Sequence, residues 1–177
     1  MHLPRTGTRM DKPIYITPQF AVTSALTPED FAAAAALGFR SVLSNRPDGE
    51  AEGQLTSRAE AVLAWQSGLQ FRHVPAGKLD LFTDEVVEGM ADAVATLKGP
   101  ILAHCASGIR SAIAWAAASA RGGNVDCVLK ALEQAGFDLD FLRDDLEGQA
   151  DRARWIGPRT PALDCSEAAK LKSLNAA

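Results

Sequence analysis

The chain has 177 residues, of which 47% are hydrophobic and 23% are charged, so it can form one domain with a substantial core and is not expected to be disordered. Its formal net charge of −4 argues against a nucleic-acid-binding surface. No apolar run approaches the roughly 18 residues that a membrane-spanning helix needs. We therefore expect neither nucleic acid nor a membrane among its partners.

Strands and helices are expected to alternate along the chain, since short apolar runs are followed by segments with helical spacing and recognisable caps. The expected strands cover residues 13–16, 20–23, 39–44 and 69–74 and a run that ends at His104. The expected helices run from Thr27 to Gly38, over about 56–66, from Thr83 onward, and over 112–121, about 125–135 and 138–155.

This order of elements predicts an α/β fold with a mostly parallel central sheet and helices on both faces. Ligands bind such sheets at the carboxyl ends of the strands. The loops 45–50 and 75–84 and the loop after His104 should therefore share one rim. We expect a flexible leader over 1–12, a folded domain over 13–156, and a loose tail with a short helical end over 157–177.

The segment 99–111 combines an apolar run with Cys105 and Arg110, which are separated by four residues. Gly108 permits a tight turn, and the amides of a turn that leads into a helix converge on an anion. A helix N-terminus and a guanidinium both favour the thiolate, and Arg110 offers planar donors to an oxyanion. These residues indicate a site where a nucleophilic sulfur attacks, or carries, an anionic group.

Three segments resemble the phosphatase-like domain of bacterial beta-lactamase-hydrolase-like proteins, within the superfamily of cysteine-dependent tyrosine and dual-specificity phosphatases. They are residues 16–18, 45–50 and 105–111, and the resemblance extends over roughly 13–146. It implies a three-layer α/β/α fold of the dual-specificity type and a hydrolase that acts on a phosphate ester through a phosphocysteine intermediate.

Carried over by position, the resemblance makes Cys105 the nucleophile, Arg110 the phosphate clamp and Ser111 the hydroxyl that assists departure of the sulfur. The anion would be held by the loop residues between nucleophile and clamp, together with the clamp itself. These residues are Ala106, Ser107, Gly108, Ile109 and Arg110.

The length of this loop departs from the resemblance. Typical tyrosine phosphatases place five residues between the cysteine and the arginine, whereas rhodanese-type sulfurtransferases use a shorter ring of the length found here. A sulfurtransferase that carries a persulfide on Cys105 is therefore an alternative, and a non-catalytic anion or redox sensor is a third. The phosphatase hypothesis is preferred because the other two phosphatase-like segments occur in order around the loop.

The general acid is the least determined residue of the predicted site. Residues 73–75 resemble the segment that precedes this acid in dual-specificity enzymes, but Lys78 stands at the aligned position. Asp80 and Asp48 are the preferred candidates. Asp84 is weaker, because acidic residues are favoured in the first turn of any helix.

Arg46 is either a second anion contact or a solvated loop charge. His104 precedes the cysteine on a strand, where neighbouring side chains point to opposite faces, so we expect it to shape the loop and not to transfer protons directly.

The three histidines show no metal-ligand spacing, and we expect no metal or other cofactor. The expected substrate is a phosphorylated small molecule or a phosphoprotein, and the oligomeric state stays open.

Three cysteines, an odd number, favour free thiols and a cytoplasmic location. Cys127 and Cys165 are expected to have no role at the site. The first nine residues contain no apolar core of a secretory signal, and Met10 as well as Met1 is a candidate native start.

Overall fold

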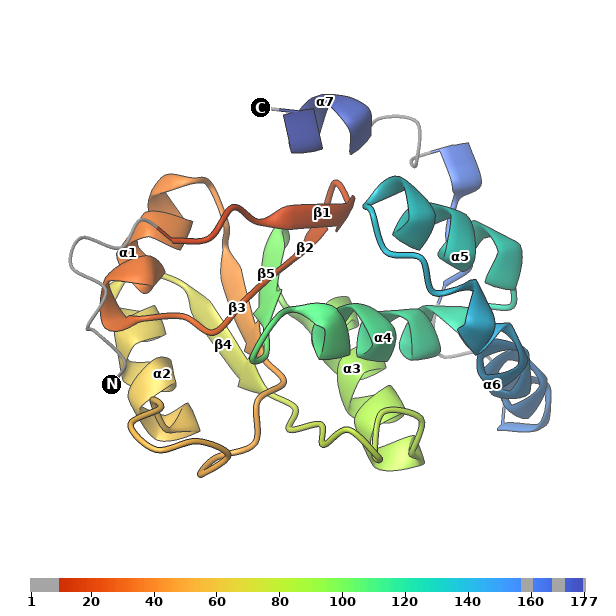
Figure 1. Cartoon of the computed structure of the whole chain (residues 1–177), viewed down its shortest axis with the longest axis horizontal. Helices are drawn as coiled ribbons and strands as arrows, with labels where there is room; N and C mark the ends of the chain where they lie inside the picture. Colours follow the sequence, from red (N-terminus) through yellow and green to blue (C-terminus); the bar gives the residue numbers. More distant parts are fainter. Residues whose placement is uncertain (1–9, 157–160, 167–170, 177) are drawn as a thin grey trace.

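The computed structural model describes residues 10–156, 161–166 and 171–176 and contains a central five-stranded sheet (Figure 1). The spatial order of the strands is β1-β2-β5-β3-β4. Strand β1 is antiparallel to β2, and the other neighbouring strands are parallel, as the sequence predicts. The strands are β1 (Ile14–Thr17), β2 (Phe20–Thr23), β3 (Ser41–Ser44), β4 (Gln70–His73) and β5 (Ile101–His104).

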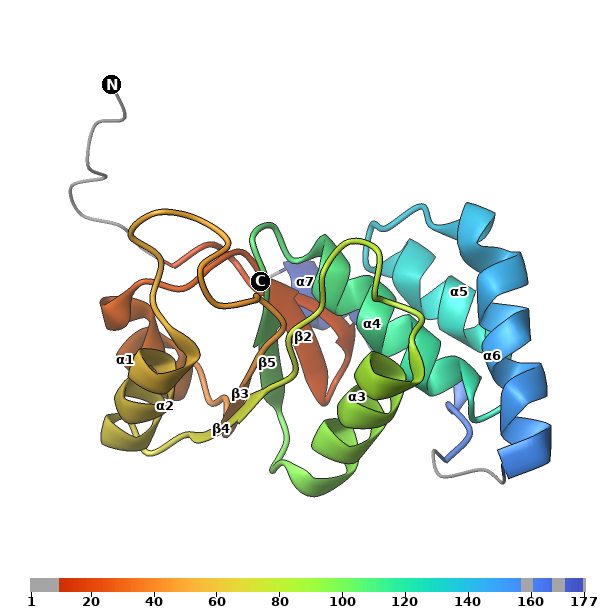
Figure 2. The same ribbon diagram turned by 90° about the horizontal axis from the view of Figure 1, so that it is seen from below.

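Helices cover both faces of the sheet, which gives the expected three layers (Figure 2). On one face, α1 (Pro28–Ala36) and α2 (Ser57–Gln66) pack on alternate strand residues such as Val42 and Leu102. On the other face, α3 (Asp84–Thr96) and α4 (Ile109–Ala120) pack on the intervening residues Leu43 and Ala103. The two apolar clusters follow from the alternation of side chains along each strand.

Helices α5 (Val125–Gln134) and α6 (Arg143–Ile156) extend the α4 side of the molecule (Figures 1 and 2). The stretch that the sequence predicts as one helix over 138–155 begins instead with a short 3-10 helix, η1 (Asp140–Leu142), which leads into α6. The expected helix starts at Thr27 and Thr83 are confirmed, since both threonines are N-caps.

The described part of the C-terminal segment contacts the domain and contains the short helix that the sequence predicts. Helix α7 (Leu171–Ala176) lies beside β1 (Figure 1), with Leu171 buried. The Asn175 side chain accepts a hydrogen bond from the Tyr15 amide at 2.9 Å and donates one to the Tyr15 carbonyl at 3.0 Å. These two bonds extend the hydrogen bonding of an edge strand, whose outer groups otherwise lack partners.

Two of the three cysteines form a disulfide, which corrects the prediction of free thiols. Cys127 on α5 is bonded to Cys165 in the C-terminal segment, and Cys105 is the free cysteine of the described residues. The odd cysteine count therefore no longer supports a reducing compartment.

The leader predicted over 1–12 lies outside the described residues except for its last three. Of these, Asp11 accepts hydrogen bonds from Thr23 and Ser24. None of the described helices is long and apolar enough to cross a membrane.

Candidate active site

Three loops leave the sheet at one edge, as the strand order predicts. Ser44 at the end of β3 pairs with both His73 of β4 and His104 of β5, so the three strands end level with one another. Backbone hydrogen bonds then join the loops themselves: the Asn45 amide donates to the His104 carbonyl at 2.8 Å, and the Ala76 amide donates to the Asn45 carbonyl at 3.0 Å. The loops after β3, β4 and β5 therefore form one rim.

Asn45 connects two of these loops through its side chain as well. It is fully buried, and its Nδ2 donates to the Val74 carbonyl at 2.9 Å and contacts the Met90 sulfur at 3.1 Å. A buried amide that bonds to backbone of a neighbouring loop fixes the position of that loop. The sequence analysis did not select Asn45, and an asparagine directly after an apolar strand is the signal that could have found it.

The Cys105 loop turns tightly into α4, as the sequence predicts. Cys105 is fully buried at its base, and the Gly108 amide points at the sulfur, with 3.1 Å between N and Sγ. Gly108 has a φ of +91° and is the N-cap of α4, which begins at Ile109 and not at Ala112 as expected. The start of the helix, where backbone amides lack partners within the helix, therefore lies next to the thiol.

Replacing Gly108 with alanine should destabilise the protein more than the same change at Gly123. Both glycines have a φ above +90°, but a Cβ at Gly108 would lie 3.1 Å from the Thr23 carbonyl oxygen, whereas a Cβ at Gly123 would meet nothing within 4 Å. We expect Gly108→Ala to lower the free energy of unfolding by about 2–3 kcal/mol and Gly123→Ala by about 1 kcal/mol. Urea unfolding measures both, and equal losses would contradict the close approach.

Arg110 extends from α4 to the two neighbouring loops and is only 6% exposed. Its Nη1 donates to the Ala76 carbonyl at 2.9 Å. Its two terminal nitrogens also form a bidentate ion pair with the Glu50 carboxylate, with Nη1 2.8 Å from Oε1 and Nη2 2.8 Å from Oε2. The hydrogen bond with Glu50 is the largest cause that raises the pKa of Arg110, and the Cys105 thiol contributes as well. The predicted clamp is therefore held in place beside the sulfur.

Glu50 is the main site residue that sequence reasoning missed. Besides Arg110, it contacts Arg46, whose Nε lies 3.1 Å from Oε2. Bonding to Arg110 first, and to Arg46 second, lowers the pKa of Glu50, so the carboxylate is ionised at neutral pH. Glu50 thus joins the two arginines, and Arg46 is held in the site and is not a freely solvated loop charge.

Ser111 and His104 lie on either side of the cysteine along the chain and face different surroundings. Ser111 is fully buried in the first turn of α4, and its hydroxyl has no hydrogen-bond partner among the described residues. His104 is fully buried too, and its Nε2 lies 3.2 Å from Oε1 of Glu60 on α2, without hydrogen-bond geometry. The imidazole therefore packs on the α2 side of the sheet, as the alternation of strand side chains predicts.

Two of the three candidate acids are engaged elsewhere. Asp48 accepts the amide of Ser57 at 2.6 Å and its hydroxyl at 2.7 Å, and these bonds lower its pKa. Asp84 is bonded to Arg121 at 2.6 Å and also contacts Arg152, and its pKa is lowered, first by Arg121. A lowered pKa leaves both side chains deprotonated at neutral pH, so both are poor proton donors.

Asp80, the third candidate acid, has different surroundings from Asp48 and Asp84. It is exposed in the loop between β4 and α3, the same loop whose Ala76 carbonyl accepts from Arg110. Its Oδ2 folds back over Gly77, where a Cβ would lie only 2.6 Å from it. Among the three candidate acids, Asp80 is the one for which the structure shows no cation or amide that binds the carboxylate. Lys78, at the position aligned with the acid, is exposed in this loop.

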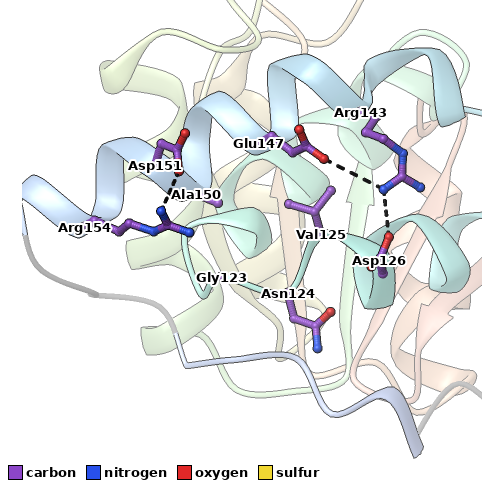
Figure 3. A pocket seen from close by; sticks show the side chains of 9 residues that line it. All are labelled: Gly123, Asn124, Val125, Asp126, Arg143, Glu147, Ala150, Asp151 and Arg154. Carbon is purple, nitrogen blue, oxygen red and sulfur yellow. Dashed lines mark hydrogen bonds and ion pairs between the residues drawn. The ribbon is translucent and has the colours of Figure 1, made fainter.

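A hollow of about 320 Å³ lies between the start of α5 and α6 (Figure 3). None of its lining residues belongs to the three rim loops. Its charged groups are paired with one another, Arg143 with Asp126 at 2.7 Å and Arg154 with Asp151 at 3.2 Å. In the part of the chain that the structure describes, no group of three or more His, Cys, Asp or Glu side chains could hold a metal ion. The Cys105 loop, where the thiol, the Gly108 amide and the Arg110 guanidinium come together, is the candidate active site.

A family model matches more than half of the chain. The model of the beta-lactamase hydrolase-like protein, phosphatase-like domain, matches residues 14–122, which run from β1 to just past the end of α4. The chain belongs to this family. The match contains all three rim loops, whereas α5, α6 and α7 lie beyond it.

The curated relatives that the chain matches are much longer than the chain. A beta-lactamase hydrolase-like protein of Xylella fastidiosa (strain Temecula1) is 32% identical over 158 residues, which cover 86% of this chain and 36% of the relative. A protein of the same name from Agrobacterium fabrum is 26% identical over 114 residues, 64% of this chain and 26% of the relative. The chain spans about a third of the length of the curated relatives it matches.

Solved structures show the same fold. A candidate phosphatase from Neisseria meningitidis Z2491 superposes with a TM-score of 0.66 and 27% identity, over 77% of this chain and 96% of that one. The core catalytic domain of the PP-IP phosphatase SIW14 from S. cerevisiae has a TM-score of 0.53 and 13% identity, over 85% and 98%. The second likeness concerns the fold alone. The family is that of the beta-lactamase hydrolase-like phosphatase-like domain, and the fold is one that phosphatases share.

Proposed function

We propose that the protein is a cysteine-dependent phosphatase that cleaves a phosphate ester through a phosphocysteine intermediate on Cys105. The observation that carries this proposal is the Gly108 amide 3.1 Å from the Cys105 sulfur at the start of α4, with the Arg110 guanidinium beside it. Amides, a helix N-terminus and a guanidinium around one sulfur stabilise both a thiolate and a phosphoryl group that approaches it.

The proposed reaction has two displacements at phosphorus. The Cys105 thiolate attacks the phosphorus atom, a P–S bond forms, and the bond to the ester oxygen breaks as that oxygen takes a proton from an acid. Water then attacks the phosphorus, the P–S bond breaks, and inorganic phosphate leaves. In the second step, the Ser111 hydroxyl, which has no partner among the described residues, would donate a hydrogen bond to the departing thiolate.

Arg110 would hold the non-bridging oxygens during both displacements. Glu50 and Ala76 bind Nη1 and Nη2, and the guanidinium also interacts with the Cys105 side chain. A guanidinium carries five hydrogens in one plane, so donors that Glu50 and Ala76 do not use would bind a phosphoryl group held on Cys105. In the mechanism, the ion pair with Glu50 orients the arginine.

Asp80 is the proposed acid, and the leaving group provides a test. Asp80→Asn should lower kcat for phenyl phosphate by about 10²–10³-fold, since the departing phenoxide then lacks a proton donor. Turnover of 2,4-dinitrophenyl phosphate should fall much less, because its leaving group needs no proton. If Asp48→Asn showed this pattern and Asp80→Asn did not, the role would pass to Asp48.

A sulfurtransferase is the second candidate, and the four-residue spacing between Cys105 and Arg110 favours it. In that reaction the Cys105 thiolate takes a sulfur atom from a donor such as thiosulfate, which releases sulfite, and passes it to a thiol or to cyanide. The phosphatase is preferred because family and fold are phosphatase-like. The substrate is proposed to be a phosphorylated small molecule or a phosphoprotein.

A further inference from the structure

Two arginines share one carboxylate oxygen at the rim of the site. Oε2 of Glu50 lies 2.8 Å from Nη2 of Arg110 and 3.1 Å from Nε of Arg46. The two guanidinium groups are therefore immediate neighbours. Two positive charges against one carboxylate leave a local excess of one positive charge in a chain whose formal net charge is −4.

Arg46 has side-chain hydrogen-bond donors that no described residue uses. Only its Nε is bonded among the described residues, so Nη1 and Nη2 carry hydrogens that no described residue takes. The side chain is only 17% exposed, which separates it from an ordinary surface arginine. A guanidinium that is largely withdrawn from water gains most from an anion that completes its hydrogen bonds.

We propose that the substrate carries a second anionic group directly beside the reacting phosphoryl group, and that Arg46 is the specificity-determining residue that binds it. This rests on the proposed function, because it assigns the reacting group to Cys105 and Arg110. Glu50 holds the two guanidiniums side by side, so adjacent acidic groups on one ligand can contact one arginine each. The second group is a phosphoryl group or a carboxylate, which offer the same acceptor oxygens.

Binding to the full chain with Cys105→Ser, which cannot turn over a substrate, separates the possibilities. Titration calorimetry compares methylphosphonate, which has one anionic group, with pyrophosphate and phosphonoacetate, which have two adjacent ones. At least one two-group ligand should bind about tenfold or more tightly than methylphosphonate, since one added charge-assisted contact has that effect. A preference for pyrophosphate alone indicates a second phosphoryl group, and a preference for both ligands indicates any adjacent acid.

Variants in the same background assign the preference to Arg46. Arg46→Gln should reduce it to about twofold or less, so that the two-group ligands lose more affinity than methylphosphonate does. Arg46→Lys should retain part of it, because the charge remains but the planar fork is lost. Arg58→Gln is the matched control: Arg58 is exposed on α2, and the structure shows no side chain that pairs with it, so its loss of one charge should leave the preference intact.

The proposal is overturned if the two-group ligands bind no better than methylphosphonate, or if their advantage survives in Arg46→Gln. Failure of the proposed function is recognised by a separate measurement. The wild-type protein would then release no phosphate from any ester, whatever the result of the binding titrations.

Discussion

Replacing Cys105 with serine is expected to reduce phosphate release from phenyl phosphate by at least about 10⁴-fold, since removal of a covalent nucleophile has effects of this size or larger. A serine hydroxyl is close to the thiol in size but is not ionised at neutral pH, even beside the Gly108 amide and Arg110. The thermal midpoint should stay close to that of the wild type. Steady-state kinetics and thermal unfolding measure the two effects separately.

The other cysteines supply the matched control. A double variant with Cys127→Ser and Cys165→Ser removes the disulfide between α5 and the C-terminal segment. It should lose stability, by about 2–4 kcal/mol, but keep most of its activity, because neither sulfur belongs to the rim loops. If Cys105→Ser kept a tenth of wild-type turnover, the covalent mechanism would be excluded.

Arg110→Lys is expected to be nearly as damaging as Arg110→Ala, and both should lower kcat/KM by about 10²–10³-fold. Lysine keeps the positive charge, but one ammonium group cannot bind both oxygens of Glu50 and the Ala76 carbonyl at the same time. It also cannot offer two parallel donors to a phosphoryl group. Kinetics on phenyl phosphate measure the loss.

Arg143→Lys is the control for the arginine series, because Arg143 pairs with Asp126 and Asp140 away from the rim loops. It should change kcat/KM by less than about twofold, as surface ion pairs contribute little. Activity of Arg110→Lys within tenfold of the wild type would mean that Arg110 acts only through its charge.

The layout of the site could be predicted from the sequence because it depends on local patterns and chain order. Alternating strands and helices with clear caps place three loops at the carboxyl ends of parallel strands, and Ser44, His73 and His104 indeed end level with one another. The positive φ of Gly108 follows from its place in a tight turn before a helix. The start of α4 was expected three residues too late, because the turn ends at Gly108.

The side-chain partners could not be predicted, because they depend on the directions that residues take once the loops have folded. Glu50 is 60 positions from Arg110, and nothing in the loop sequence says that its carboxylate turns toward the arginine. Asp48 is a candidate acid from its place in the loop sequence, but its carboxylate binds the amide and the hydroxyl of Ser57. The parity of the cysteine count likewise says nothing about which pairs meet, and Cys127 meets Cys165 across 38 positions.

The most direct test of the central claim is the identity of the covalent adduct on Cys105. Wild-type protein is mixed with phenyl phosphate or, in parallel, with thiosulfate, denatured within milliseconds, and the peptide that contains Cys105 is analysed by mass spectrometry. The account predicts a phosphoryl group on Cys105 with phenyl phosphate, absent in Cys105→Ser, and no sulfur transfer from thiosulfate to cyanide. A persulfide on Cys105 that is discharged by cyanide, together with no phosphoryl adduct, would contradict it and make the protein a sulfurtransferase.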